Sequence, residues 1–177
     1  MLILIISDTH GNQTTINGMV QYLQNHSIDL TIHLGDNYQD AQAIINAGFP
    51  VIRIPGTWTA EYKNPLIENR RVEDIEGWRF FLTHTPEAHY NDLANDKDPQ
   101  KVFQRGECDV FCHGHTHRPE ITLNNKIIRL NPGHLKKAED RGYLASFAVV
   151  DVTSSEIKMT LIEYESGGVI DSRIVNK

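Results

Sequence analysis

The first 54 residues alternate between strand-like and helix-like patterns of apolar side chains. Residues 2–6 form a continuous apolar run, which is typical of a β-strand covered on both faces. Apolar side chains at helical spacing then predict a helix over 13–25. Two further strand patterns, at 30–34 and 50–54, flank a short helix near 41–45. Because strands joined through helices run parallel with right-handed crossovers, this order predicts a parallel sheet.

The rest of the chain is richer in strand patterns. Residues 70–75 and 78–83 predict a hairpin across Glu76 and Gly77, and Asp98 before a proline predicts the start of a short helix. Further strands are predicted at 110–112, 126–130, 146–152 and 156–163. We therefore expect a single domain over residues 1–177, an α/β (α+β) chain with two mixed β-sheets packed face to face and helices outside.

Composition narrows the function classes. The 17 Lys and Arg residues against 23 Asp and Glu give a net charge of −6, so we expect no broad affinity for nucleic acid. No apolar run approaches the roughly 18 residues of a membrane helix, and the N-terminal run lacks the basic flank of a signal peptide. Cys108 and Cys112 lie too far apart along a strand for a disulfide. We expect a cytoplasmic protein without membrane contacts, and a homo-oligomer remains open.

Polar side chains follow five of the predicted strands. They are Asp8 and His10, Asp36, Thr57, His84, and His115 and His117. Ligands of open α/β sheets bind beyond the carboxyl ends of the strands, so these loops can converge on one point. In an extended chain, positions i and i+2 project to the same side, so Asp8 and His10 can reach one metal, as can His115 and His117. Carboxylates with imidazoles suit zinc, manganese, iron or nickel rather than calcium.

With these motifs the chain resembles the calcineurin-like metallophosphoesterases, specifically their small single-domain bacterial and archaeal phosphodiesterase branch. The segments that carry the resemblance are Ser7–Asn12, Leu34–Asp36, Gly114–Pro119 and Asn131–Gly133. The resemblance implies a four-layer αββα sandwich with two divalent metal ions at the strand ends. It also implies a hydrolase that cleaves small phosphate esters, with diesters favoured, by attack of a hydroxide that bridges the two metals. Phosphomonoesters and cyclic nucleotides remain open as substrates.

The resemblance assigns two sets of metal ligands: Asp8, His10 and His117 for the first ion, His84 and His115 for the second, and Asp36 as a bridge between them. Because a bridging carboxylate serves both ions, Asp36 is the residue on which catalysis is expected to depend most. Manganese is the favoured metal, with nickel, iron and zinc as alternatives.

The sequence departs from the family pattern at Thr57, which stands where the family has an asparagine that ligates the second metal. We therefore expect a second site that binds its metal more weakly, in which either a water held by Thr57 replaces the amide or the metal position is only partly occupied. The departure keeps an alternative function open, a non-catalytic or weakly active scaffold of the same fold, like the retromer scaffold subunit. Six of the seven expected ligands are present, which favours the enzyme.

Six further polar side chains have candidate roles near the predicted site. They are Asn12 and Arg118 for binding the phosphate, His33 and His113 for orienting ligand side chains, and His89 and His134 as general acids. A general acid must reach the leaving oxygen of the substrate, so its position decides its role.

Overall fold

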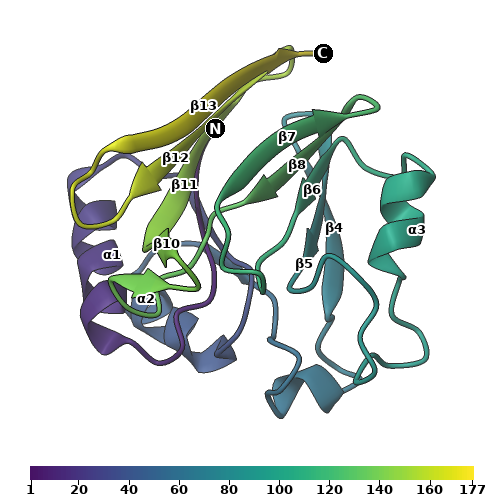
Figure 1. Ribbon diagram of the computed structural model, residues 1–177, viewed down its shortest axis with the longest axis horizontal. Helices are drawn as coiled ribbons and strands as arrows, with labels where there is room; N and C mark the ends of the chain where they lie inside the picture. The colour runs from purple at the N-terminus through teal and green to yellow at the C-terminus, as the bar shows by residue number, and fades with distance from the viewer.

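The computed structural model describes all 177 residues and consists mainly of two β-sheets packed face to face (Figure 1). The first sheet has six strands in the order β13-β12-β11-β1-β2-β3. In chain order they are β1 (Leu2–Ile6), β2 (Leu30–His33), β3 (Val51–Arg53), β11 (Ser146–Val152), β12 (Glu156–Glu163) and β13 (Val169–Asn176). As the sequence predicts, β1, β2 and β3 run parallel, and the antiparallel partners β11 to β13 make the sheet mixed.

The second sheet has five strands in the order β4-β5-β6-β8-β7. They are β4 (Arg70–Ile75), β5 (Trp78–Thr83), β6 (Val110–Cys112), β7 (Glu120–Asn124) and β8 (Ile127–Asn131). Here β5, β6 and β8 run parallel, while β4 and β7 are antiparallel at the two edges. A small ribbon, β9 (Glu139–Asp140) with β10 (Tyr143–Leu144), lies outside both sheets.

Helices cover the outer faces of the two sheets (Figure 1). On the first sheet these are α1 (Gln13–Asn25) and α2 (Gln42–Asn46), the latter preceded by the 3-10 helix η1 (Tyr38–Ala41). On the second sheet it is α3 (Pro99–Gln104), and a second 3-10 helix, η2 (Glu61–Lys63), lies in the loop after β3. The resulting order of helix, sheet, sheet and helix confirms the predicted αββα sandwich.

The continuous apolar run of β1 is explained by its place between two apolar layers. Ile3 and Ile5 belong to a core of 20 buried side chains between the sheets. Leu4 and Ile6, which point the other way, pack instead in the cluster that contains Met19 of α1. Burying such a side chain contributes about 1.5–3 kcal/mol, so β1 is fixed from both sides and its C-terminal end is a firm support for the residues that follow.

Three residues cap or terminate helices, and Asp98 starts α3 as the sequence predicts. Asn12 caps α1, since its Oδ1 accepts from the backbone N–H of Thr15 at 3.3 Å. Asp98 caps α3 through the N–H groups of the two residues after Pro99. Gly48, just beyond α2, has a φ of +89°, the left-handed conformation expected of a glycine after a helix.

The strand β13 was not predicted from the sequence. It forms the free edge of the first sheet and shifts register against β12 between Leu161 and Ile162. Most of its side chains are exposed on both faces, so the residues lack the apolar alternation by which a half-buried strand is recognised. None of the helices has both the length and the apolar character needed to cross a bilayer.

Candidate metal centre

Asp8 lies two residues after the end of β1 and is 1% exposed. Its backbone N–H donates to the carbonyl of Gly35 at 3.0 Å, which ties the end of β1 to the loop after β2. Its Oδ2 accepts from Oγ of Ser7 at 2.6 Å and from the backbone N–H of His115 at 2.8 Å. The carboxylate is therefore held by loops from both sheets, at the ends of β1, β2 and β6.

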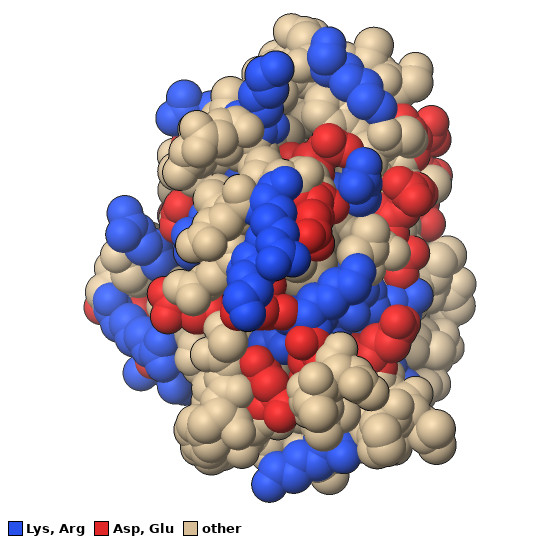
Figure 2. All heavy atoms as spheres, turned by 90° about the vertical axis from the view of Figure 1, so that its right-hand side faces the viewer, with Lys and Arg blue, Asp and Glu red and all other residues tan.

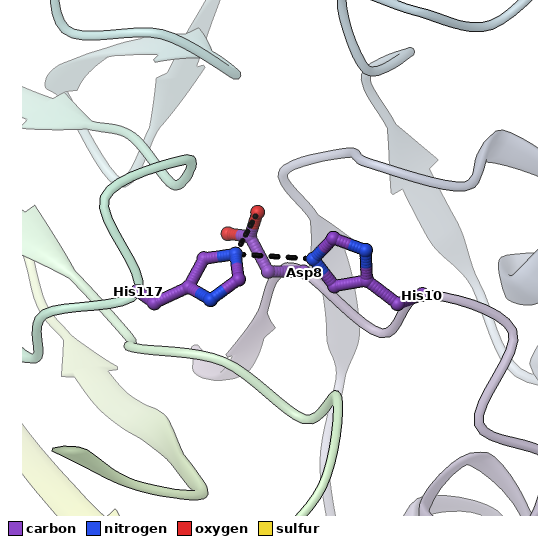
Figure 3. Close-up of side chains that lie close together, drawn as sticks. All are labelled: Asp8, His10 and His117. Atoms are coloured by element: carbon purple, nitrogen blue, oxygen red, sulfur yellow. Dashed lines mark hydrogen bonds and ion pairs between the residues drawn. The ribbon is translucent and has the colours of Figure 1, made fainter. Parts of the chain in front are cut away.

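The first candidate metal group consists of Asp8, His10 and His117, whose ligand atoms all lie within 4.8 Å of one another (Figure 3). Nδ1 of His10 lies 2.8 Å from Oδ2 of Asp36, and Nδ1 of His117 lies 2.6 Å from Oδ2 of Asp140. Because an ionised carboxylate only accepts hydrogen bonds, each Nδ1 carries a proton, and in the neutral ring each Nε2 then presents a lone pair.

The two Nε2 atoms of His10 and His117 lie 3.0 Å apart and face each other (Figure 3). Oδ1 of Asp8 lies 3.3 Å from Nε2 of His117. Two nitrogen lone pairs and a carboxylate oxygen at these distances repel one another unless a cation lies among them. The donor set therefore fits a divalent ion that takes nitrogen and oxygen ligands.

The second candidate group consists of Asp8, Asp36 and His84, again with ligand atoms within 4.8 Å. His84 follows β5 directly and is 2% exposed. Its Nδ1 lies 2.9 Å from the carbonyl oxygen of Leu34, so Nδ1 donates and Nε2 is left as the ligand atom. Asp8 belongs to both groups, which therefore overlap.

His115 lies beside the second group without belonging to it. Its ring centroid lies 5.1 Å from that of His84. Burial lowers the pKa of His115 to about 4, with a further contribution from the neighbouring His84 imidazole. His115 is therefore neutral at pH 7, which is the state in which an imidazole binds a metal.

Both carboxylates of the site are ionised at neutral pH. Burial raises the pKa of Asp8, but the neighbouring imidazoles of His117 and His84 and the hydrogen bond from the Ser7 hydroxyl outweigh burial and hold the pKa well below its ordinary value. Burial acts in the same direction on Asp36, and the hydrogen bond from His10 again outweighs it, so the pKa of Asp36 is lowered. Two anionic groups in one pocket favour a bound cation.

The backbone at these residues is left-handed, not extended as the sequence suggested. Nine non-glycine residues have a positive φ, and five of them are candidate ligands: Asp8 (+52°), His10 (+49°), Asp36 (+80°), His115 (+66°) and His117 (+63°). The expectation of an extended i, i+2 pair was therefore wrong. Such backbone conformations are costly for non-glycine residues and collect at functional sites, where the surroundings enforce them.

Two glycines let the site loops approach each other. A Cβ on Gly114 would lie 1.9 Å from Oγ of Ser7 and 2.6 Å from Oδ2 of Asp8. A Cβ on Gly56 would lie 2.3 Å from the backbone oxygen of Asp36. A side chain at either position would have to displace these neighbours, so both glycines allow the close packing around the carboxylates.

Thr57 is completely buried in the loop after β3, and its Oγ1 has no hydrogen-bond partner in the protein. Its backbone carbonyl accepts from Nδ2 of Asn91 at 2.9 Å, which joins this loop to the loop after β5. A buried hydroxyl without a partner is uncommon and costs free energy. The position where the family has a ligating asparagine thus carries a polar atom that the protein itself leaves unsatisfied.

Asp140 is a site residue that the sequence analysis missed. It lies on β9, accepts from Nδ1 of His117 and also lies 3.4 Å from Nζ of Lys136 and 3.3 Å from Nζ of Lys137. In the sequence it belongs to a charged run that is typical of a solvated loop. Only the acidic residue's contact with a ligand imidazole distinguishes it, and that contact spans 23 residues of chain.

His33 and His113 are both buried behind the ligand loops. Nε2 of His33 lies 3.1 Å from Oγ1 of Thr9, and its Nδ1 accepts from the backbone N–H of Gly35 at 3.2 Å. Nδ1 of His113 lies 3.0 Å from the carbonyl of Gly114, and its Nε2 accepts from Arg129. Each contacts the backbone of a ligand loop rather than a ligand side chain.

The remaining candidates lie in different environments. Asn12 uses both ends of its amide within the protein, as the α1 cap and as a donor to the carbonyl of Lys136 at 2.9 Å. Arg118 is exposed, and its guanidinium makes no hydrogen bond or ion pair. His134 is fully buried, with Nε2 3.0 Å from the carbonyl of Tyr143 and Nδ1 accepting from a backbone N–H. With both nitrogens engaged, His134 has no free position for a proton transfer.

Known proteins with similar sequences identify the family to which this chain belongs. The sequence matches the calcineurin-like phosphoesterase superfamily domain over residues 1–155, so the chain belongs to this family, as the resemblance predicted. The phosphodiesterase MJ0936 of Methanocaldococcus jannaschii is 23% identical over 171 residues, which cover 89% of this chain and 95% of that protein.

Solved structures agree on the fold. YfcE, a phosphoesterase from E. coli, superposes with a TM-score of 0.73 at 20% identity, over 98% of both chains. Wild-type Vps29 from Entamoeba histolytica, solved as a complex with Zn²⁺, superposes with a TM-score of 0.69 at 19% identity, over 99% of both chains. At these identities the similarity concerns the fold alone.

Proposed function

We propose that this protein is a metal-dependent phosphoesterase that hydrolyses small phosphate esters, with diesters preferred, at a centre of two divalent ions. The observation that carries the proposal is the pair of Nε2 lone pairs on His10 and His117, which face each other at 3.0 Å beside the Asp8 carboxylate. The second overlapping group, with Asp36 and His84, provides the ligands for a neighbouring ion.

Six side chains would hold the two ions in the assignment that the family resemblance implies: Asp8, His10 and His117 the first, His84 and His115 the second, and Asp36 both. Five of the six belong to the two candidate groups, and His115 lies beside the second group. Manganese is the metal we favour, because the mixed oxygen and nitrogen ligands and the absence of nearby thiolates suit it. Bound ions of this kind lower the pKa of a coordinated water and neutralise the charge of the phosphate.

The protein's own contribution is to hold and orient these ligands. Carboxylates behind His10 and His117 and the Leu34 carbonyl behind His84 fix each imidazole with Nε2 directed into the site. Because the tautomer and orientation of each imidazole are already fixed, the ligands need no rearrangement when a metal or substrate binds. The family membership and the relative named a phosphodiesterase support the substrate class.

A non-catalytic scaffold of the same fold is the second candidate. The observation in its favour is Thr57, which replaces the expected amide ligand and is buried with an unsatisfied hydroxyl. A second ion held more weakly would give a protein that binds one metal firmly and turns over slowly. The two candidates differ in a single measurable quantity, which is turnover at saturating metal.

The test is hydrolysis of bis-p-nitrophenyl phosphate and p-nitrophenyl phosphate in saturating Mn²⁺, by wild type and by Asp36→Ala. We expect wild type to cleave the diester faster, and Asp36→Ala to lose about 100-fold or more, because it removes the carboxylate shared by both ions. Asp151→Ala, which removes an exposed carboxylate on β11, is the matched control and should retain full activity. Equal, metal-independent rates in wild type and Asp36→Ala would refute the enzyme.

A further inference from the structure

Two aromatic side chains are exposed next to the metal centre. Trp58 is 69% exposed and Tyr90 is 75% exposed, and no other Phe, Tyr or Trp side chain of the chain is exposed. Aromatic rings normally bury most of their surface, so two exposed rings on one small protein need an explanation. Both belong to loops that also carry candidate ligand positions.

The two rings lie together and near the ligands. The centroid of Trp58 lies 5.5 Å from that of Tyr90 and 5.6 Å from that of His89, both in edge-to-face geometry. Trp58 directly follows Thr57, and Tyr90 lies six residues after His84. Gly56, two residues before Trp58, packs against the backbone of Asp36, where a Cβ would lie 2.3 Å from the Asp36 oxygen, so this loop lies directly against a candidate ligand.

Hydrogen bonds to buried side chains hold the loop that carries Tyr90, and a further hydrogen bond joins it to the loop that carries Trp58. Oδ2 of Asp92 accepts from the backbone N–H of His89 at 2.8 Å and from Arg70 at 2.8 Å, and its Oδ1 accepts from the Tyr62 hydroxyl at 2.6 Å. The Arg70 side chain is 1% exposed. The hydrogen bond from Asn91 to the Thr57 carbonyl joins the two loops. Rings mounted on such a support keep their positions, which reduces the entropy lost when a ligand binds.

The polar atoms of the rings are also free. The indole N–H of Trp58 and the hydroxyl of Tyr90 make no hydrogen bond within the protein, whereas the buried Trp78 donates to the carbonyl of Thr153. Exposed faces with free donors at the rim are suited to a planar ligand that carries its own acceptors, as nucleobases do. The metal centre beside them would take the phosphate of the same molecule.

We propose that Trp58 and Tyr90 form an aromatic platform for the nucleobase of a nucleoside phosphoester whose phosphate lies at the metal centre. Because the two ring planes are 70° apart, one ring stacks on the base and the other contacts its edge. The inference rests on the proposed function for the phosphate end of the ligand and adds the chemical class of its other end. A single nucleotide fits better than a long nucleic acid, because the chain carries a net charge of −6. The face on the α3 side likewise mixes Lys and Arg with Asp and Glu, without a continuous basic track (Figure 2).

The test is calorimetric titration of the Mn²⁺-loaded protein with adenosine 5′-monophosphate and with ribose 5-phosphate, which lacks the base. Released phosphate is assayed so that ligand concentrations are known. We expect wild type to bind the nucleotide about tenfold more tightly, within the range that base–aromatic stacking gives on alanine substitution. Trp58→Ala and Tyr90→Ala should each lose most of this preference and leave ribose 5-phosphate binding unchanged, while Trp58→Phe retains most of it.

The matched control is Leu123→Ala, which removes an exposed apolar side chain on β7 and should keep the full preference. Stacking should also change the fluorescence of the exposed Trp58 when the nucleotide is added but not when ribose 5-phosphate is added. Equal affinities for the two ligands, or no binding of either, would overturn the platform. The proposed function fails by a different measurement, the absence of phosphoester hydrolysis. That result would still leave the ratio of the two affinities measurable.

Discussion

Asp140 accepts a hydrogen bond from Nδ1 of His117 at 2.6 Å, and this contact decides which nitrogen of His117 faces Asp8. Desolvation raises the pKa of Asp140, but its hydrogen bonds from His117, Lys137 and Lys136 outweigh that and hold the pKa low. The carboxylate is therefore ionised, and it makes the imidazole in front of it a more basic ligand. At the proposed metal centre Asp140 would act on a bound ion through His117, which makes it a positioning residue.

Replacing Asp140 by asparagine should weaken metal binding without unfolding the protein. The amide keeps the size of the side chain and one acceptor but removes the charge, so we expect affinity for Mn²⁺ to fall by about 10- to 100-fold. Calorimetric titration of metal into Asp140→Asn and wild type measures this. Asp151→Asn, on the exposed face of β11, should titrate like wild type. An unchanged affinity in Asp140→Asn would show that the contact does not support the metal site.

The metal-free protein should lose stability as the pH falls from 7 to 5. His33 is completely buried, and burial lowers its pKa to about 4. The unfolded chain takes up a proton near the ordinary histidine pKa, whereas the folded chain does not until the pH approaches 4. Protons therefore favour the unfolded state in this window, and His33 should contribute about 2 kcal/mol of lost stability. Burial also lowers the pKa of His113 to about 4, which adds to the slope in the same direction.

Urea unfolding in the presence of a chelator, at pH 7, 6 and 5, measures this slope. His33→Gln should be less stable than wild type at pH 7 but should show a clearly shallower dependence on pH. His26→Gln, which replaces an exposed histidine after α1, should keep the wild-type slope. If His33→Gln keeps it too, the buried imidazole is not the titrating group.

The fold could largely be predicted from the sequence, because the apolar pattern of most strands and helices matches the faces that they bury in the tertiary structure. The run at 2–6 is apolar on both sides, and the strand there is covered on both sides. The edge strand β13 could not be found in this way, because exposed side chains on both faces give it no period. Its pairing with β12 depends on the tertiary structure, and no local sequence pattern predicts it.

The candidate site was predictable in composition but not in geometry. Residues after strand ends converge, since parallel strands end at one edge of a sheet. The left-handed backbone of Asp8 and His10 was not predictable, because those residue types only weakly favour it and the packing of Gly114 against Asp8 helps to impose it. The sequence analysis did not find Asp140 as a site residue, because its partner His117 is distant in sequence and β9 is only two residues long.

The close packing at Gly114 gives a further prediction. In Gly114→Ala, the new methyl group would meet Ser7 and Oδ2 of Asp8, and the neighbours must shift. We expect a destabilisation of about 1–3 kcal/mol, as for other overpacked sites, and weaker Mn²⁺ binding because Asp8 moves. Gly168→Ala is the matched control, since its methyl group would meet only the flexible side chain of Ser166. Urea unfolding and metal titration of both variants measure these effects, and a Gly114→Ala variant as stable and as metal-binding as Gly168→Ala would contradict the close contact.

Thr57 offers the sharpest test of how the second ion is held. Its hydroxyl is buried without a protein partner, so it either serves a bound ion or water, or it is a cost that the fold tolerates. Thr57→Val keeps the shape of the side chain and removes only the hydroxyl. Thr57→Asn restores the amide that the family pattern has at this position.

We expect the two variants to move in opposite directions. Thr57→Val should weaken the second of two Mn²⁺ binding steps by about tenfold, which corresponds to 1.4 kcal/mol and is typical of a lost hydrogen bond to a charged group. Thr57→Asn should strengthen the same step and raise turnover at limiting metal, because an amide oxygen is a better ligand than a hydroxyl. Calorimetric heats and hydrolysis rates measured over the same range of metal concentration separate the two steps. If both variants match wild type in stoichiometry and metal dependence, and Thr57→Val only gains stability, then the hydroxyl does not face the metals and the second ion is held by Asp36, His84 and His115 alone.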